Sequence, residues 1–177
     1  MKKGVMEPSL KDVSKMEWFD KKTRAIIAFF LTVTIIVMPF PKLFITAHII
    51  GDSMMPFVYD DDRVLCLSDF AVGEYKRGDV VVFVLEDEQT TLIKRIVAVG
   101  GDTLEIKDGK IFVNDELLEE PYLLESDYKS WDYRTYVPEG MVFVMGDNRR
   151  VSKDSREFGC VNESCIYGKY ICKLWGK

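Results

Sequence analysis

The chain has 177 residues, of which 47% are apolar and 30% are charged, and its formal net charge is −5. This length accommodates one domain of ordinary size, and so many charges exclude a protein that crosses a membrane several times. The charge is uneven, with +4 on residues 1–42 and −9 on residues 43–177. Because nucleic-acid binding needs a basic surface, the acidic main part argues against a nucleic-acid partner.

The metal-binding residue types are few and widely spaced. There is one histidine, His48, and the four cysteines form no CxxC pair. We therefore predict no metal site. Cys160 and Cys165 are near enough in sequence to form a disulfide in an oxidising environment, and the sequence leaves their state open.

Residues 25–41 form an uncharged run that is mostly apolar. As a helix it would be about 26 Å long, slightly less than a hydrocarbon core of ~30 Å, and residues 42–45 can extend it. A buried core helix and a cleaved secretory signal are the alternatives. The run is apolar on all sides, longer than a signal core, and followed by no good small-x-small site. We therefore predict an uncleaved transmembrane signal anchor over residues 25–45.

The charges that flank this run predict its orientation. Lys21, Lys22 and Arg24 precede it, whereas only Lys42 follows closely. By the positive-inside rule, residues 1–24 form a cytoplasmic tail and residues 46–177 an extracellular domain of a single-pass cell-membrane protein.

Short apolar runs alternate with turn signals after the anchor. The Asp-Gly pair at 108–109, between two β-rich runs, is a strong hairpin signal. We expect a mainly β domain of antiparallel strands, built as a sandwich or a partly open barrel. Residues 119–138 are polar and aromatic, and we expect a long surface excursion there. The expected strands are residues 63–67, 80–85, 92–99, 103–106, 111–113, 141–145 and 167–175.

Ser53 is the first candidate catalytic residue. It lies in the segment GDSMMP (51–56), where glycine and proline enforce an irregular backbone that can expose a hydroxyl. An ordinary turn is the alternative. Because the only histidine lies five residues before Ser53, a Ser-His-Asp triad is hard to build, and a lysine base would be needed instead.

Lys94 is the candidate base. In a strand it shares a face with Leu92, Ile96 and Ala98, so its ammonium would be desolvated. Desolvation lowers a lysine pKa from ~10.4 toward the range that suits a base near neutral pH. The alternative is an edge lysine that reaches water. Arg95 points to the opposite face, where we expect it to be structural and paired with a carboxylate.

A third polar cluster, residues 145–156 (MGDNRRVSKDSR), follows the expected strand at 141–145. A Gly-Asp-Asn turn beside Asp-Ser-Arg favours many hydrogen bonds between side chains and backbone. The cluster is either a polar loop or a set of supporting residues whose hydroxyl orients the lysine amine.

Together these clusters resemble the bacterial type I signal peptidases, a family with a Ser-Lys dyad, and in particular their short Gram-positive-like form. The matching segments occur in the family's order behind the anchor: residues 51–56, 75–83, 93–102 and 146–149, with Ser152 and residues 154–156. The resemblance implies a signal-peptidase-like antiparallel β catalytic domain behind one N-terminal transmembrane helix.

The resemblance also implies roles for single residues. Ser53 would attack the scissile carbonyl, and Lys94 would accept its proton. Ser152 would hold the lysine amine, and Asp154 and Arg156 would form an ion pair near the site. The backbone N–H of Ser53 would be one oxyanion donor. Gly51 stands where other members often carry a serine as second donor, so only main chain is available there.

The implied activity is a membrane-bound serine endopeptidase that removes signal peptides from secretory preproteins after a small-x-small motif. Its partners would be preproteins and the lipid bilayer, with no metal or cofactor. Two rivals are a self-cleaving Ser-Lys repressor of the SOS type, which needs a DNA-binding domain, and an inactive β domain that only binds partners. The second predicts that Ser53→Ala and Lys94→Ala leave function intact.

Overall fold

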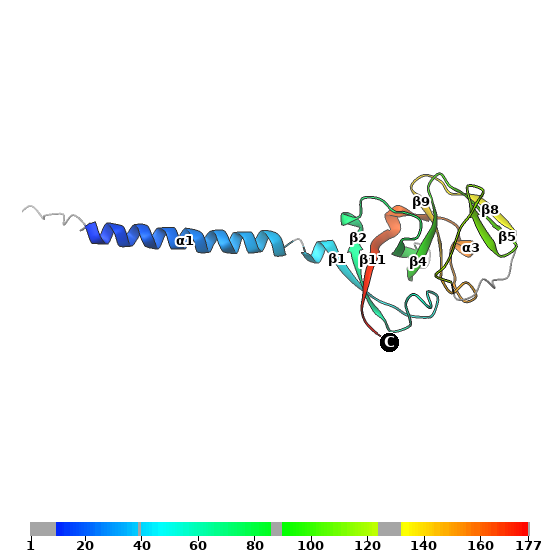
Figure 1. Cartoon of the computed structure of the whole chain (residues 1–177), viewed down its shortest axis with the longest axis horizontal. Helices are drawn as coiled ribbons and strands as arrows, with labels where there is room; N and C mark the ends of the chain where they lie inside the picture. Colours follow the sequence, from blue (N-terminus) through cyan, green and yellow to red (C-terminus); the bar gives the residue numbers. More distant parts are fainter. Residues whose placement is uncertain (1–9, 39, 86–89, 124–131, 177) are drawn as a thin grey trace, which may run out of the picture. The chain divides into compact units, whose positions relative to one another are not determined.

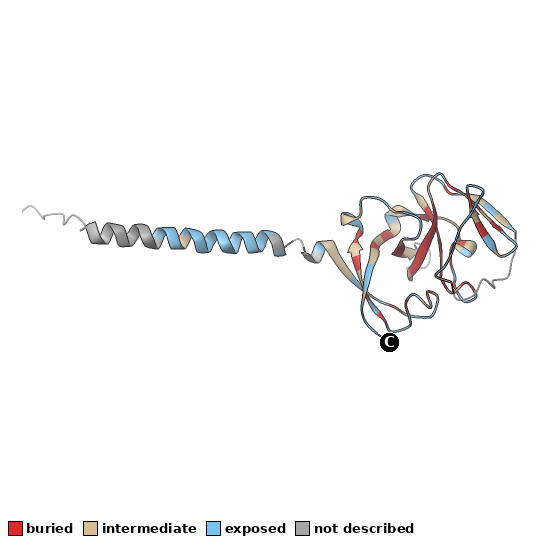
Figure 2. Cartoon of the chain, viewed as in Figure 1, coloured by how far each residue is buried: buried red, intermediate tan, exposed pale blue. Residues whose placement is uncertain are grey.

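The computed structural model describes residues 10–38, 40–85, 90–123 and 132–176, and the chain divides into two compact units, Met1–Pro41 and Lys42–Lys177 (Figure 1). Helix α1, Leu10–Val37, makes up most of the first unit, and a short helix α2, Phe40–Leu43, follows it. Along α1 the large apolar side chains from Ile26 to Val37 that the structure describes are exposed (Figure 2). Within the described residues, no helix has both the length and the apolar character that crossing a membrane requires.

The helical segment differs from the predicted anchor at both ends. Helix α1 begins at Leu10, well before residue 25, so it includes polar residues that we assigned to a tail. At the other end, Phe44 and Ile45 belong to strand β1, Phe44–His48. Their backbone pairs with β2, and Ile45 packs against buried residues of the second unit, which explains the strand. Residues 1–9 and residue 39 lie outside the described part.

A large antiparallel sheet forms most of the second unit. Its strand order is β1-β2-β11-β3-β4-β9-β10, so β4 lies between β3 and β9. Five of these strands contain residues predicted from the sequence. The strands of this sheet besides β1 are β2 Arg63–Ser68, β3 Val80–Leu85, β4 Thr90–Val99, β9 Met141–Met145, β10 Val161–Asn162 and β11 Ile166–Trp175, of which only β10 lacks a predicted counterpart. The predicted mainly β, antiparallel class is confirmed.

A smaller antiparallel sheet has the order β7-β6-β5-β8. Asp108 and Gly109 join β5 to β6 with φ values of 49° and 68°, the left-handed conformation that a two-residue hairpin requires. The predicted Asp-Gly hairpin is therefore confirmed. The strands are β5 Thr103–Lys107, β6 Lys110–Val113, β7 Glu116–Leu117 and β8 Tyr133–Tyr136.

The prediction of a surface excursion over residues 119–138 is wrong for part of that segment. It contains β8, which pairs with β5, and Val137 is fully buried. The polar alternation of Tyr-Arg-Thr-Tyr hid this strand, because only one face of it meets the core. Residues 124–131 lie outside the described part.

Three groups of buried apolar residues form the core, seen as red stretches on the strands in Figure 2. One of them joins Met54 and Val58, from the segment after β1, to Val80 and Ile93 on strands β3 and β4. The core therefore holds the Ser53 segment against β4. The remaining short elements are α3 Ser155–Phe158 and two 3-10 turns, Asp69–Ala71 and Glu163–Cys165.

Candidate active site

Ser53 lies in the loop between β1 and β2. Met54 and Val58, on its C-terminal side, are almost completely buried and fix the loop to the core. On its N-terminal side Gly51 has a φ of 90°, and its N–H donates to the Asp60 carboxylate at 2.8 Å. The main-chain donor that the resemblance left at Gly51 is thus already engaged by Asp60.

The side chains of Ser53 and Lys94 meet although 41 residues separate them. Lys94 Nζ lies 2.8 Å from Ser53 Oγ and donates to the Ile93 carbonyl at 2.9 Å. Lys94 is only 2% exposed, because its strand β4 lies inside the large sheet between β3 and β9. The structure therefore brings together the two residues that the sequence singled out separately.

Burial changes the acidity of the lysine. It lowers the pKa of Lys94 from 10.5 to about 8, although the nearby carboxylates of Asp154 and Asp147 act in the opposite direction. At a pKa of about 8, roughly a tenth of the amine is neutral at pH 7. The amine is therefore available as a base near neutral pH.

Leu92, Ile96 and Ala98 were predicted to share one face of β4 with Lys94. The prediction is confirmed for Leu92 and Ile96 and wrong for Ala98. Leu92 and Ile96 pack in one core group, as expected, but Ala98 packs in another together with its neighbour Val97. The cause is a register shift against β9 between Ile96 and Ala98, which interrupts the alternation of the strand.

Arg95 occupies the opposite face of β4. Its Nε and Nη2 donate to the two oxygens of Asp147 at 2.9 and 2.6 Å, and its Nη1 donates to the Gly78 carbonyl. The expected carboxylate partner of Arg95 is confirmed as Asp147.

The turn after β9 contacts the Ser53 loop directly. The Asn148 N–H donates to the Ser53 carbonyl at 3.0 Å, and its side-chain amide donates to the Asp52 carbonyl at 3.1 Å. Gly146 approaches even more closely, since a Cβ there would lie 2.5 Å from the Ser53 carbonyl oxygen. The sequence predicted that this Gly-Asp-Asn segment is a turn. It did not predict that Asn148 and Gly146 contact the Ser53 loop.

Ser152, Asp154 and Arg156 surround the same turn. Asp154 accepts hydrogen bonds from the Gly146 N–H at 3.0 Å and from Arg156 Nε at 2.7 Å. Ser152 Oγ is buried and has no hydrogen-bond partner among the described residues, so it does not hold Lys94 Nζ here. It lies against Gly146, where a Cβ would be 2.2 Å from it.

Other ligand chemistry is not evident in the described part of the chain. Nowhere in residues 10–38, 40–85, 90–123 and 132–176 do three His, Cys, Asp or Glu side chains gather as metal ligands would. Cys160 and Cys165 are thiols rather than a disulfide.

The family model described as "Signal peptidase, peptidase S26" matches residues 22–175. The chain is 33% identical to signal peptidase IB of Staphylococcus aureus over 178 aligned positions, which cover 90% of this chain and 89% of that protein. It is 35% identical to signal peptidase I of Bacillus licheniformis over 129 positions, or 67% and 69% of the two chains.

A solved structure of a signal peptidase is also similar to this chain. The crystal structure of a signal peptidase I from Enterococcus faecalis V583 matches with a TM-score of 0.50 and 30% identity, over 55% of this chain and 97% of that one. The residues matched by the family model include the Ser53 loop, β4 and the turn after β9. The chain therefore belongs to the signal peptidase family, peptidase S26, as an enzyme of the bacterial type I.

Proposed function

We propose that this enzyme removes signal peptides from secretory preproteins with Ser53 as the nucleophile and Lys94 as the general base. The observation that carries the proposal is the 2.8 Å contact between Lys94 Nζ and Ser53 Oγ, made by a lysine that is 2% exposed. A buried amine beside a hydroxyl is the arrangement that activates a serine when no histidine is in reach.

In the reaction the neutral Lys94 amine takes the proton of the Ser53 hydroxyl, and Oγ attacks the scissile carbonyl carbon. The backbone N–H of Ser53 donates to the oxygen that becomes negative. When the tetrahedral intermediate collapses, the Lys94 ammonium gives its proton to the departing amine. Water then hydrolyses the acyl-enzyme, with the same amine as base.

The substrate side of the proposal rests on apolar side chains near the nucleophile. Ile50, three residues before Ser53, is 84% exposed, and Val151, near the Asn148 turn, is 64% exposed. Such side chains suit an apolar peptide better than a charged one. We assign preproteins with small-x-small cleavage sites as the substrates.

Processing of a purified preprotein by the full chain in detergent tests this assignment. We expect wild type to cleave and Ser53→Ala to lose about 10⁴-fold or more in kcat, because the attacking oxygen is removed. Below pH 8 the wild-type kcat should rise about tenfold per pH unit, as Lys94 loses its proton, and it should level off above.

Ser68→Ala is the matched control, since Ser68 is a buried serine whose hydroxyl contacts only Asp69 in the described structure. It should cleave at the wild-type rate. A Ser53→Ala protein that cleaves as fast as wild type would exclude the nucleophile and would agree with a domain that only binds partners.

We further propose that residues 25–43, the predicted anchor without the two residues that belong to β1, attach the enzyme to the cell membrane in a single pass, with the N-terminus in the cytoplasm and the catalytic unit outside. The support is the apolar run itself and the exposure of its described large side chains, such as Phe29, Phe30 and Ile35, at 64%, 63% and 72%. Exposed apolar residues on all sides of a helix are stabilised by lipid rather than by water.

Extraction of membranes with alkaline carbonate measures this attachment. Wild type should stay in the membrane pellet, and Phe30→Asp with Leu31→Asp should move to the supernatant, because two carboxylates in the run oppose insertion. Exchanging the two residues, Phe30→Leu with Leu31→Phe, preserves composition and should stay in the pellet. Release of wild type by carbonate would contradict the attachment.

A further inference from the structure

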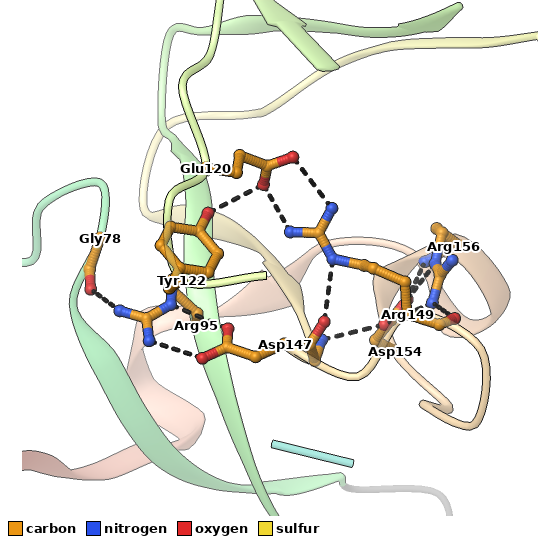
Figure 3. Close-up of polar contacts among 9 residues, drawn as sticks. Gly78, Arg95, Glu120, Tyr122, Asp147, Arg149, Asp154 and Arg156 are labelled. Atoms are coloured by element: carbon orange, nitrogen blue, oxygen red, sulfur yellow. Dashed lines mark hydrogen bonds and ion pairs between the residues drawn. The ribbon is translucent and has the colours of Figure 1, made fainter. Parts of the chain in front are cut away.

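Residues 119–123, which follow β7, reach the site from a part of the chain that the proposed mechanism does not use. Both oxygens of the Glu120 carboxylate accept from Arg149, at 2.5 Å from Nη2 and 3.1 Å from Nη1 (Figure 3). The two side chains are 9% and 1% exposed. Because a buried guanidinium needs a matched partner, the Glu120 carboxylate helps to hold the end of the Arg149 side chain.

Arg149 in turn holds Gly146, which packs against the Ser53 backbone. Its Nε donates to the Gly146 carbonyl at 2.9 Å, while the Gly146 N–H donates to Asp154 at 3.0 Å. Gly146 is thus fixed on both sides of its Cα, and that Cα faces the Ser53 carbonyl and the Ser152 hydroxyl. Hydrogen bonds therefore run without a break from Glu120 to the residue that packs against Ser53.

Tyr122 makes a second connection from the same segment. Its hydroxyl donates to Glu120 at 2.8 Å, and its ring lies 4.1 Å from Cζ of Arg95. The ring of Phe57, from the Ser53 loop, lies 4.8 Å from the same Cζ. Burial, and secondly the charge of Glu120, raise the pKa of Tyr122, so its hydroxyl remains a donor at physiological pH.

The turn at residues 146–149 is consequently held by two arginines, Arg95 through Asp147 and Arg149 through Gly146, and each arginine contacts the 119–123 segment (Figure 3). We propose that Glu120 and Tyr122 form a brace that keeps this turn against the Ser53 loop, which makes Glu120 a positioning residue for the Ser53–Lys94 pair. The inference rests on the proposed function of that pair.

The brace acts through geometry rather than through contact with substrate. The Ser53 Oγ–Lys94 Nζ pair works only if the Ser53 backbone stays in place, and that backbone is contacted by Gly146 and Asn148. A displacement of about 1 Å at a reacting atom can reduce a rate roughly 10²-fold. Loss of the brace should therefore lower kcat and leave KM nearly unchanged.

The test measures kcat and KM of the full chain on a preprotein peptide for Glu120→Ala, Glu120→Gln and Tyr122→Phe, each alone and combined with Asn148→Ala. We expect Glu120→Ala to lower kcat about 10–100-fold with KM within about twofold. Gln retains one acceptor for Arg149, so its loss should be smaller. Tyr122→Phe retains the ring on Arg95 and should lose the least.

The double variants separate positioning from general destabilisation. If Glu120 acts by holding the turn against the Ser53 loop, Glu120→Ala should lower kcat less than about threefold once Asn148→Ala has already removed the side-chain hydrogen bond from the turn to Asp52, since coupled residues are not additive. Glu105→Ala is the matched control. It removes a partly exposed carboxylate 3.7 Å from Arg134 in the small sheet, and it should keep the wild-type kcat.

Equal fold-losses for Glu120→Ala in the wild-type and Asn148→Ala backgrounds would overturn the brace, as would a wild-type kcat in Glu120→Ala. Should Glu120→Ala fail to fold, the same comparison of Glu120→Gln in the two backgrounds decides. Ser53→Ala, measured in parallel, keeps the two proposals apart. An active Ser53→Ala would refute the dyad and the brace together, whereas an inactive one with wild-type Glu120 variants would refute the brace alone.

Discussion

Lys94→Met should abolish proteolysis and at the same time make the protein more stable. The variant has no base for the Ser53 hydroxyl, and the loss of general base catalysis should lower kcat by about 10²–10⁴-fold or more. Met fills nearly the same space without a charge. Wild type holds an ammonium at 2% exposure with a pKa reduced from 10.5 to about 8, a cost of about 3 kcal/mol at ~1.36 kcal/mol per pKa unit.

Part of this gain is offset, because Ser53 Oγ and the Ile93 carbonyl lose the donor that now contacts them. The net stabilisation should be about 1–2 kcal/mol, or a rise of roughly 2–8 °C in Tm for a domain of this size. Thermal unfolding at pH 7, followed by circular dichroism, measures it.

The pH dependence provides a sharper check. Because the folded pKa of Lys94 lies below the unfolded value, the unfolded chain binds more protons between about pH 8 and 10.5, and wild-type stability gains from rising pH in that window. Below about pH 8 Lys94 is charged in both states, so the full desolvation cost of its ammonium lowers the stability of the folded wild type. The stability advantage of Lys94→Met over wild type should therefore be constant at pH 6–7 and shrink between pH 8 and 10.5.

Lys107→Met is the matched control, because Lys107 is an exposed lysine on strand β5. It should leave kcat unchanged and keep the wild-type Tm at pH 7. A Lys94→Met protein that is less stable than wild type throughout this range would show that the lysine is not held against a desolvation cost.

Gly146→Ala should be the second severe change. The added Cβ would lie 2.2 Å from Ser152 Oγ, 2.5 Å from Ser152 Cβ and 2.5 Å from the Ser53 carbonyl oxygen, closer than real Cβ contacts come. The turn and the Ser53 loop must separate, so kcat should fall about 100-fold or more. The strain should also lower the free energy of unfolding by about 1–3 kcal/mol.

Gly73→Ala is the matched control for the steric effect of the added Cβ. Gly73 also lacks a left-handed φ, but a Cβ there meets no atom within 4 Å, so both kcat and Tm should stay at the wild-type values. Active-site kinetics and thermal unfolding of the two alanine variants provide the comparison. Wild-type kcat in Gly146→Ala would mean that the contact between the turn and the Ser53 loop is dispensable.

Local signals in the sequence were sufficient for much of the fold. Alternation and turn residues predicted β3 at its observed bounds and the hairpin at Asp108 and Gly109, because both depend on neighbours in the chain. Strand β1 was missed since its residues continue an apolar run, and only pairing with β2 makes them a strand. For the same reason the predicted anchor, residues 25–45, included two residues of β1.

The same distinction between local and long-range features applies to the active site. The period of β4 predicted that Lys94 is buried and that Arg95 faces the other way, since both follow from one strand. The contacts of Asn148 with the Ser53 loop span 96 residues, and those of Glu120 with Arg149 span 29. Neither has a local signature, because each depends on how two loops pack against one another. The same holds for the close approach of Gly146.

The neighbouring positions of Lys94 and Arg95 have a consequence for how relatives are compared. In a strand, adjacent side chains point to opposite faces, so Lys94 can contact Ser53 and Arg95 cannot, whereas Arg95 can pair with Asp147 and Lys94 cannot. A polypeptide with identical composition, charge and hydropathy but these two residues in reverse order would direct a guanidinium, which stays protonated at any physiological pH, toward the serine. Global similarity scores would hardly register this transposition, although it would convert a protease into an inert protein.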